Sequence, residues 1–532
     1  MPKLRVLAAL ALVCAANLWL EIALTRIFSA LMFYHFAFLV IAMALLGLGA
    51  SGVWVYASER FTADGVAGDM SSAARRFAAS TVLALVYVLA NPIAAYVGAL
   101  EAPKLSQTTF LQLVLLCLVA FLPFFHAGLL VSLAVTHFRD HVHRVYAWDL
   151  AGAALGALLV GPLLAAFGAP PLVVLVALSA CVAALLLEPS RRSVGAMASV
   201  ALLLVLALTT RLFATPSTKS LRAERVAFDR WNTFSHVTVE KIADGSHDIL
   251  IDSAARTPIA HAREATSEKW MTDITALGYL VHPGGAHAAL IIGPGGGIDV
   301  ARALASGVQR VTAVDVNPLI ATDIMRDRFE VESGGLYRDP RVSVVVEEGR
   351  SFVRRSDLRF QVIQVSLVDT WAATASGAFA LTENTLYTLE AFDDYYAHLT
   401  DDGVLSLTRW WTFLSGPETQ RLTILAAGAW SNEVFLPGRR GATSTWRPTT
   451  TLRLSWSRRR RSPTTSSAVS TSGARAWAIE RCCLEPSTQP PSSGRWWRTG
   501  PSAPRSVPRP TTYLLPPTTA CSSSTSSSQA SS

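Results

Sequence analysis

Seven apolar segments fill the first two hundred or so residues and constrain the fold more than any other feature of the sequence. A bilayer core of about 30 Å requires about 20 apolar residues per helix. Each segment approaches or exceeds that length: residues 4–27, 33–56, 77–99, 109–137, 145–168, 170–187 and 193–212. The second segment follows the first within a few residues, which favours a permanent span over a cleaved signal peptide. The sequence therefore predicts a multi-pass α-helical membrane domain of about seven helices over residues 1–213, embedded in a lipid bilayer.

Polar and small residues within these segments predict specific helix contacts. Glu21 and Arg26 lie inside or near the first segment, where an unpaired charge would cost at least a few kcal/mol. We therefore expect them to pair with each other or with backbone groups. Gly152 and Gly156 lie four residues apart, on one face of a predicted helix, which allows a neighbouring helix to approach closely.

The chain turns polar after Phe213, and its hydrophobic pattern changes twice. The stretch "FSHVTVEKIADGSHDILIDS" alternates apolar and polar residues on both sides of Asp244 and Gly245, which predicts a β-hairpin. We assign residues 214–262 to a linker and a small β domain. From Ala288, the short apolar runs "AALIIG", "RVTAVD", "RVSVVV", "FQVIQVS" and "GVLSLT" are separated by helical stretches. This pattern predicts a doubly wound α/β domain over residues 263–436, with its ligand crevice at the carboxyl ends of the strands.

The glycine cluster in "LIIGPGGGID" lies at the end of the first of these strands. Glycines at the start of a helix let backbone N–H groups approach a ligand closely, and the cluster holds Gly293, Gly295, Gly296 and Gly297. The next strand ends in Asp315, where a carboxylate can accept both ribose hydroxyls. The nicotinamide fingerprint requires a third glycine that is absent, and the spacing fits better the G-x-G-x-G turn of S-adenosylmethionine enzymes.

Another acid, Glu348, follows the third strand. It would face the adenine edge or the second ribose side of the crevice, although a solvated charge at a strand end fits the residue type nearly as well. We include it among the predicted cofactor-binding residues.

These features together resemble the spermidine synthase family of polyamine aminopropyltransferases. The similarity runs from about Trp231 to Leu436 and rests on the hairpin, "LIIGPGGG", "AVDVNP", "DPRVSVVVEEGRSF", "VIQVSLVDT", "LTENTLYTLEAF" and "DDGVLSLTRW". The resemblance implies a class I methyltransferase fold with a small β domain in front. Polytopic bacterial membrane proteins with such a domain are also familiar, and this chain looks like one of them.

Transferred residue by residue, the resemblance implies a cofactor site with several departures from the family pattern. Gly293, Gly295 and Gly297 would line the cofactor, Asp315 would bind its ribose, and Glu348 stands where the family has an Asp near adenine. Gly296 replaces an Asp that holds the cofactor's amino group, unless Asp299 substitutes for it.

The largest departure concerns the catalytic base. Ser366 stands where the family has its catalytic Asp, and only the second acid of that motif is kept, as Asp369. The family's Tyr-His-Glu element corresponds to Met271, Thr272 and Asp273, so its acid alone remains. Asp369, Asp273 and Ser366 are therefore the candidates for catalysis.

The substrate side of the site is less determined by the sequence. A cationic diamine needs carboxylates to hold it, and Asp252 and Glu383 could contribute. Each could equally be a strand-end or cap acid, and Glu383 lies in the first turn of a helix that Thr382 is expected to cap.

We therefore expect an enzyme, a membrane-bound transferase that moves an aminopropyl group from decarboxylated S-adenosylmethionine to a small amine. Two alternatives stay open: methyl transfer from S-adenosylmethionine to an unknown nucleophile, and a non-catalytic nucleoside-binding membrane sensor or transporter. The sequence places no second His or acid at metal-ligand spacing, so we expect no metal, and we expect no nucleic-acid partner. The oligomeric state is left open.

The distribution of positive charge conflicts with this assignment. Nine Lys and Arg residues lie at the N-terminus and in alternate loops, which predicts a cytoplasmic N-terminus. Seven spans would then place the soluble domain outside, where nucleotide-type cofactors are scarce. Either the count is wrong by one, with Pro123 in the fourth segment the main candidate, or one segment does not cross. We expect a bacterial inner membrane protein with a cytoplasmic soluble domain.

The last segment, residues 437–532, differs sharply in composition. It holds fourteen Arg and two acids, and neither Lys nor Asp, so the formal net charge of +8 arises there. Its Ser, Thr, Pro and Arg content predicts disorder. A class I methyltransferase sheet usually has two further strands at this point, and their apparent loss favours a reading-frame shift over a true basic tail.

Overall fold

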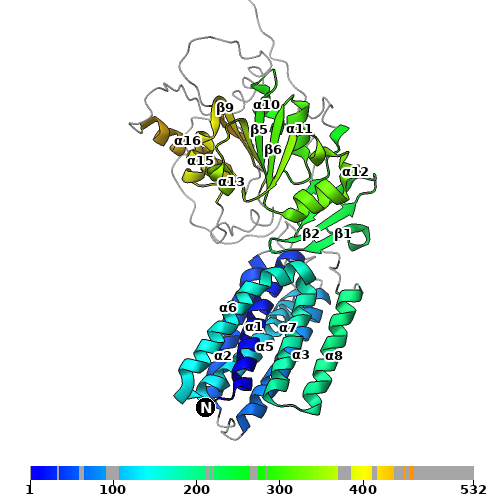
Figure 1. The fold of residues 1–532 in the computed structure, drawn as a ribbon, viewed down its shortest axis with the longest axis vertical. Coiled ribbons are helices and arrows are strands. Elements are labelled where there is room, and N and C mark those ends of the chain that lie inside the picture. The colour runs from blue at the N-terminus through cyan, green and yellow to red at the C-terminus, as the bar shows by residue number, and fades with distance from the viewer. Residues whose placement is uncertain are drawn as a thin grey trace, which may run out of the picture. The chain divides into compact units, whose positions relative to one another are not determined.

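The computed structural model divides into a helical N-terminal region, a small antiparallel sheet and a larger sheet flanked by helices (Figure 1). It describes residues 2–32, 35–58, 61, 65–90, 107–210, 212–213, 216, 221–263, 274–282, 284–368, 385–409, 416–435, 449–450 and 454–458.

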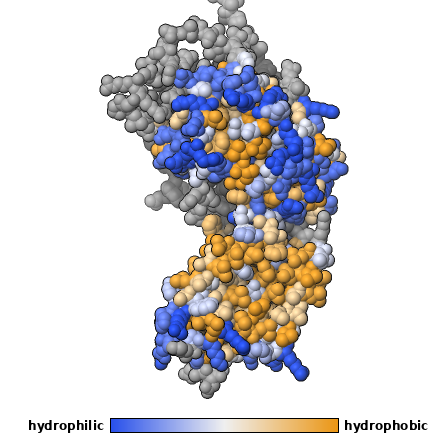
Figure 2. Space-filling model, in the orientation of Figure 1, coloured by the Kyte–Doolittle hydropathy of each residue, from blue (hydrophilic) through white to orange (hydrophobic). Residues whose placement is uncertain are grey.

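Seven helices in the described part of the N-terminal region are long and apolar enough to cross a membrane, by length and composition. They are α1 (Leu4–Leu31), α2 (His35–Ala57), α3 (Val66–Ala90), α5 (Gln107–His137), α6 (Val142–Phe167), α7 (Ala169–Leu187) and α8 (Arg191–Thr209). Apolar side chains cover most of the visible face of this bundle, whereas hydrophilic side chains are abundant over the α/β region (Figure 2). Many large apolar side chains of the helices are exposed, as a lipid-facing surface would require.

Two details of the bundle differ from the expectation. The third helix begins at Val66 rather than near residue 77, because its first three turns are too polar to be counted in an apolar segment. There Arg75 donates hydrogen bonds to Ser71 and Ser193. The fourth predicted segment is one continuous helix, α5, with Pro123 inside it, so Pro123 does not divide it into two spans.

Gly152 and Gly156 bring α6 against α1, as expected for small residues on one helix face. A Cβ at Gly152 would lie 2.2 Å from the carbonyl oxygen of Ala11, and one at Gly156 would lie 3.0 Å from the Cα of Ala15. The Trp19 indole donates to the carbonyl of Gly156 across the same contact (3.0 Å). A larger side chain at Gly152 would therefore separate the helices.

The small sheet contains four antiparallel strands in the order β1-β2-β3-β4. They are β1 (Val226–Trp231), β2 (His236–Lys241), β3 (His247–Ile251) and β4 (Ala255–Pro258). The predicted hairpin is confirmed as β2 and β3, and Gly245 at its turn has a φ of 88° that favours glycine. Two further strands extend it on either side.

The larger sheet has the order β10-β11-β9-β8-β5-β6-β7. Its parallel strands are β5 (Ala288–Ile292), β6 (Arg310–Asp315), β7 (Val342–Val346), β8 (Phe360–Ser366) and β9 (Leu399–Thr408). Ala289 and Ile291 of β5 enter one hydrophobic core, while Leu290 and Ile292 enter another on the opposite face. Both faces are thus covered, which confirms the predicted parallel sheet with helices on both sides.

The flanking helices follow the strands in alternation. They are α10 (Leu277–Leu280), α11 (Ile298–Ala305), the π-helical segment η6 (Leu319–Arg328), α12 (Glu330–Ser333), α13 (Gly349–Arg355), α15 (Leu389–Ala397) and α16 (Gly416–Phe435). The core that contains Leu290 is formed with residues of α13, α15 and α16, and the core that contains Ala289 with residues of α11 and η6.

Two strands of the tail also join this sheet, contrary to the expectation that they are lost. Leu454–Arg458 forms β11 and pairs antiparallel with β9, and Thr449–Thr450 forms β10 beside it. Leu454 and Trp456 alternate with serines, which is a strand pattern, and the edge of β9 offers backbone groups to pair with. The expectation of disorder is therefore wrong for these residues.

Candidate functional site

The glycine turn connects β5 to α11 at the carboxyl edge of the parallel sheet. Gly293, Gly295 and Gly297 have φ values of 69°, 51° and 86°, in the left-handed region that favours glycine. The Gly293 N–H donates to the carbonyl of Val314 at the end of β6, which ties the turn to the neighbouring strand (2.8 Å). Helix α11 begins directly after Gly297, so the turn has the strand-turn-helix setting of an anion- or nucleotide-binding loop.

Asp315 ends β6 beside this turn and is 7% exposed. Its carboxylate accepts from the backbone N–H of Asn317 (2.9 Å) and from that of Gly295 (3.4 Å). Burial raises the pKa of Asp315, and these two hydrogen bonds oppose the rise. A carboxylate has about four acceptor positions, so two remain for ribose hydroxyls. The residues present therefore fit a nucleoside in the cradle that Asp315 and the glycine turn form.

Tyr337 is a member of this site that the sequence did not indicate. Its hydroxyl donates to the carbonyl of Gly295 (2.9 Å), and its side chain is buried. Burial, followed by the nearby carboxylates of Asp315 and Asp299, raises the pKa of Tyr337 well above its usual value, so the phenol stays a donor. Nothing in the sequence pattern around residue 337 indicates this contact, because Tyr337 and Gly295 are about forty residues apart in the chain.

Gly296 and Asp299 have structural roles that are evident from their contacts. A Cβ at Gly296 would lie 2.0 Å from the carbonyl oxygen of Pro258 in β4, so the close approach of the small sheet by itself requires glycine. The carboxylate of Asp299 accepts from Arg302 of the same helix (3.0 Å), and both side chains are buried. Because Asp299 is paired with Arg302, this contact argues against the alternative that Asp299 holds the cofactor's amino group in place of the family's Asp.

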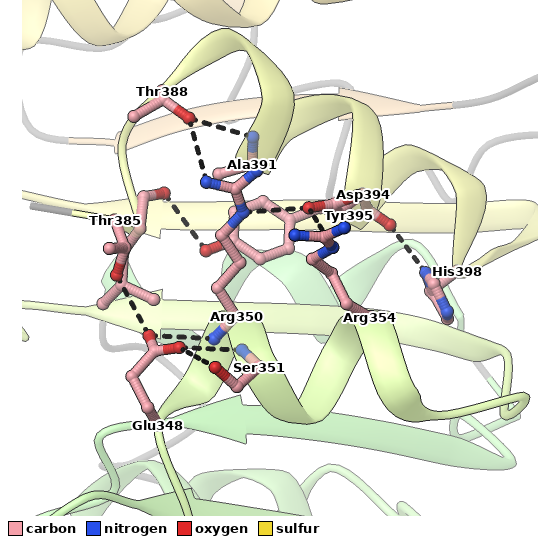
Figure 3. A network of polar contacts seen from close by, with 11 residues as sticks. Glu348, Arg350, Ser351, Arg354, Thr385, Thr388, Ala391, Asp394, Tyr395 and His398 are labelled. Carbon is pink, nitrogen blue, oxygen red and sulfur yellow. Dashed lines mark hydrogen bonds and ion pairs between the residues drawn. The ribbon is translucent and has the colours of Figure 1, made fainter.

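Glu348 caps helix α13. One of its oxygens accepts from the N–H of Arg350 and the hydroxyl of Thr385, and the other from the N–H and hydroxyl of Ser351 (Figure 3). Partial burial would raise the pKa of Glu348, but these hydrogen bonds outweigh it and lower the pKa. The cap places Glu348 after β7, one strand beyond Asp315, on the edge where the sequence predicted it.

The same close view shows how α13 and α15 are joined. The Arg350 guanidinium lies between them and donates to Asp394 (2.9 Å) and Thr388 (3.5 Å) (Figure 3). Thr388 accepts from the N–H of Ala391 and so caps α15, which begins at Leu389. The expectation that Thr382 caps this helix with Glu383 in its first turn is therefore wrong for α15, because Thr388 is its N-cap; Thr382 and Glu383 themselves lie outside the described residues.

Ser366 ends β8, at the carboxyl edge of the sheet. Its hydroxyl oxygen accepts from the side-chain amide of Gln364 (3.0 Å), and the Gln364 carbonyl accepts from the hydroxyl of Tyr279. Gln364 and Tyr279 are buried, and Gln364 also donates to the carbonyl of Thr275 (3.2 Å). A neutral hydrogen-bonded chain thus supports Ser366, where the resemblance implies an acid.

Asp252 lies in the β3–β4 turn rather than beside the glycine turn. It has a φ of 49°, and its carboxylate accepts from the N–H of His236 (2.8 Å) and the hydroxyl of Ser29 (3.2 Å). These contacts give Asp252 a structural role that does not need a substrate. The other predicted acids, Asp273, Asp369 and Glu383, lie outside the described residues.

Within the described ranges, no group of three or more His, Cys, Asp or Glu side chains could hold a metal ion. The site therefore consists of a glycine cradle, a buried carboxylate and a neutral strand end.

Comparison with known proteins shows which family this part of the chain is similar to. Residues 269–422 match the Spermine/spermidine synthase domain. A polyamine aminopropyltransferase of Ruegeria sp. (strain TM1040) is 24% identical over 205 residues, which cover 37% of this chain and 65% of the relative. Polyamine aminopropyltransferase 1 of Pseudomonas aeruginosa is 31% identical over 129 residues, covering 24% of this chain and 43% of that protein.

Solved structures of the same family are also similar. The spermidine synthase from Thermotoga maritima is 20% identical, with a TM-score of 0.30, over 38% of this chain and 64% of the other. The chain spans less than two thirds of the length of these relatives. Its C-terminal part carries a spermine/spermidine synthase domain.

Proposed function

We propose that this protein is a membrane-attached transferase that moves an aminopropyl group from decarboxylated S-adenosylmethionine to a small amine. The observation that supports it most is the joint position of the glycine turn and Asp315 within a spermine/spermidine synthase domain. The turn offers backbone N–H groups, and the carboxylate offers acceptors for ribose hydroxyls.

In this reaction the amine nitrogen attacks the methylene carbon beside the sulfonium. The carbon–sulfur bond breaks, its electron pair stays on sulfur, and methylthioadenosine leaves. The nitrogen must lose a proton, and Ser366 at the end of β8 is a hydroxyl held by Gln364 that cannot take up that proton at neutral pH. The proposal therefore assigns the base to Asp369 or Asp273, with the proton passing on to solvent.

The replacement at Ser366 also supports a second candidate function, methyl transfer from S-adenosylmethionine. In that reaction the nucleophile attacks the methyl carbon and S-adenosylhomocysteine leaves. A nucleophile that has no proton to lose needs no general base, so Ser366 at the strand end would matter less.

Membrane attachment is part of the proposal and rests on the seven helices. Arg26, near the carboxyl end of α1, donates to carbonyls of the β1–β2 turn, so the N-terminus and the soluble part belong to opposite ends of α1. A cytoplasmic soluble part then requires an outside N-terminus, against the positive-charge count. We still propose that the protein lies in the bacterial inner membrane with its transferase part in the cytoplasm. Nucleotide-type cofactors such as the proposed co-substrate are scarce outside the cell.

The test is the nucleoside product made by the full-length protein in detergent, after its reading frame has been resequenced. The protein is incubated with either decarboxylated S-adenosylmethionine or S-adenosylmethionine and a polyamine-containing cell extract, and products are identified by mass spectrometry. Methylthioadenosine formed over many turnovers, above an Asp315→Asn control, supports aminopropyl transfer. S-adenosylhomocysteine would establish methyl transfer instead, and binding without turnover would make the protein a nucleoside sensor or transporter.

A further inference from the structure

The β1–β2 turn, residues 232–235, is closed by internal hydrogen bonds. The side-chain carbonyl of Asn232 accepts from the N–H groups of Phe234 and Ser235 (both 2.9 Å). The Asn232 N–H donates to the carbonyl of Ser235 (3.1 Å), which closes the turn. A turn fixed in this way can transmit a displacement from one side to the other, because its own backbone has little freedom to absorb it.

The inner side of the turn is bonded to the nucleoside cradle through Asn317. The amide of Asn232 donates to the side-chain carbonyl of Asn317 (2.6 Å), and the amide of Asn317 donates to the hydroxyl of Ser235 (2.9 Å). All three side chains belong to residues at most 7% exposed. The N–H of Asn317 then donates to Asp315, whose carboxylate also accepts from Gly295.

The outer side of the turn is bonded to helix α1. The Arg26 guanidinium donates to the carbonyls of Thr233 (2.7 Å) and Phe234 (3.0 Å). Three residues further along α1, the hydroxyl of Ser29 donates to Asp252, whose other oxygen accepts from the first N–H of β2. Hydrogen bonds from a charged guanidinium are stronger than neutral ones, so Arg26 is the main anchor of this contact.

The residues flanking the turn add packing to these bonds. The rings of Trp231 and His236 stack across the hairpin with centroids 4.2 Å apart. The Trp231 ring also lies against Gly168, between α6 and α7, where an added Cβ would meet it at 3.1 Å. The turn is therefore held by α1 and by the α6–α7 junction at the same time.

We propose that Asn317 is a positioning residue for the nucleoside site and that it couples this site to helix α1 through the β1–β2 turn. The side chain of Asn317 fixes the backbone at the end of β6, and the N–H of Asn317 donates to Asp315. The same side chain is hydrogen-bonded to the β1–β2 turn, to which Arg26 donates. Because Asn232, Ser235 and Asn317 are buried, breaking a link among them leaves unpaired donors or acceptors, and the remaining links shift together. Coupling of this kind is reciprocal. A nucleoside bound at Asp315 stabilises the contact between Arg26 and the β1–β2 turn by the same free energy by which that contact stabilises nucleoside binding.

The first test measures the coupling without any ligand and so does not depend on the proposed function. Amide hydrogen exchange is compared between the full-length protein and its Arg26→Gln variant in lipid nanodiscs. We expect faster exchange in residues 233–236 and also in residues 316–319, with no change in α13. Arg192→Gln, a matched change at an exposed arginine in the first turn of α8, should leave all three regions unchanged. Faster exchange in the turn alone would overturn the proposal.

The second test measures affinity for methylthioadenosine by calorimetry in a double-mutant cycle. We expect Asn317→Ala to weaken binding about tenfold, as loss of one buried hydrogen-bond anchor would. Arg26→Gln should weaken binding about threefold, and the double variant no more than Asn317→Ala alone, because both act on one link. Asn317→Asp keeps the acceptor for Asn232 but loses the donor to Ser235 and adds a second buried carboxylate near Asp315, so it should not restore the affinity.

Multiplicative effects of Arg26→Gln and Asn317→Ala would show independent action and overturn the coupling. If the parent protein does not bind methylthioadenosine, the proposed nucleoside site fails, whereas the exchange experiment still decides whether α1 and Asn317 are coupled.

Discussion

At the residue scale, the chemistry of the site depends on side chains that hydrogen-bond within the protein and are also positioned at the edge of the sheet where a ligand would bind. Asp315 accepts from the glycine turn and from the N–H of Asn317, and it has acceptor positions left for a ligand. Ser366 accepts from Gln364 and is neutral. The two residues end β6 and β8, the strands on either side of β5, so a bound nucleoside would lie between an acid and a hydroxyl.

Replacing Asp315 by Asn should weaken methylthioadenosine binding about 10- to 100-fold, because hydrogen bonds to a charged group contribute about 1.5–3 kcal/mol. Since burial raises the pKa of Asp315, the carboxylate takes up its proton at a higher pH than an exposed Asp. Affinity should therefore be highest near neutral pH and fall as the pH drops through that raised pKa. Calorimetry between pH 7.5 and 5 measures both effects. Exposed Asp327 provides the control as Asp327→Asn, and an unchanged affinity in Asp315→Asn would contradict the assignment.

Ser366→Asp should raise the rate of aminopropyl transfer to a diamine at least tenfold, since a positioned general base contributes about 10²–10⁴-fold. The side-chain amide of Gln364 already donates to this position and would accommodate a carboxylate. Ser366→Asn, of the same size but without a base, serves as the control in an assay of methylthioadenosine release. Equal rates for the two variants would show that the base is elsewhere.

At the element scale, the ends of the helices decide how the crevice is built. Glu348 caps α13 and reaches Thr385, and Arg350 in the first turn of α13 reaches Asp394 of α15. Thr388 caps α15 and also accepts from Arg350. These contacts fix two helices on one face of the sheet, so Glu348 acts through the geometry of the elements, whether or not it also faces a ligand.

Glu348→Gln should reduce the local stability of α13 by about 1 kcal/mol, the usual cost of losing an N-cap. The pKa of Glu348 is lowered in the folded protein, so its stabilising effect is complete above the pKa of an unfolded Glu and is lost as the pH falls through the lowered value. Hydrogen exchange at Arg350 and Ser351 reports the change. Exposed Glu332→Gln is the matched control, and equal protection in Glu348→Gln and the parent protein would rule out the cap.

At the scale of the whole molecule, two parts with different distributions of apolar side chains share one chain. The helical part exposes apolar side chains, and the α/β part buries them in two cores on either face of its sheet. Helix α1 belongs to the first part but hydrogen-bonds the small sheet of the second. The sheet also takes in residues 449–450 and 454–458 from the tail, so the Arg-rich composition after Leu436 does not mark the end of the fold.

The full chain should sediment with membranes and resist extraction by alkaline carbonate, because seven apolar helices are costly to expose to water. Labelling of a cysteine placed at residue 2 and another at exposed Asp244 should occur from opposite sides of the membrane, since α1 separates them. All six native cysteines are changed to Ala in the parent for this experiment: Cys14, Cys117, Cys181, Cys482, Cys483 and Cys521. Labelling of both positions from one side would mean that α1 does not cross.

The sequence by itself determined the order of the parts, the parallel sheet, the glycine turn and Asp315, because hydrophobic periodicity and glycine placement are local signals. It also determined that Ser366 stands where the resembled family has an acid. Only the tertiary structure decided what Asp252, Gly296 and Asp299 contact, and that Tyr337, Gln364 and Asn317 join the site. These contacts close between residues far apart in the chain, so no pattern of neighbouring residues records them. The two tail strands were missed for the same reason, since short strands are stabilised by the sheet edge that they pair with.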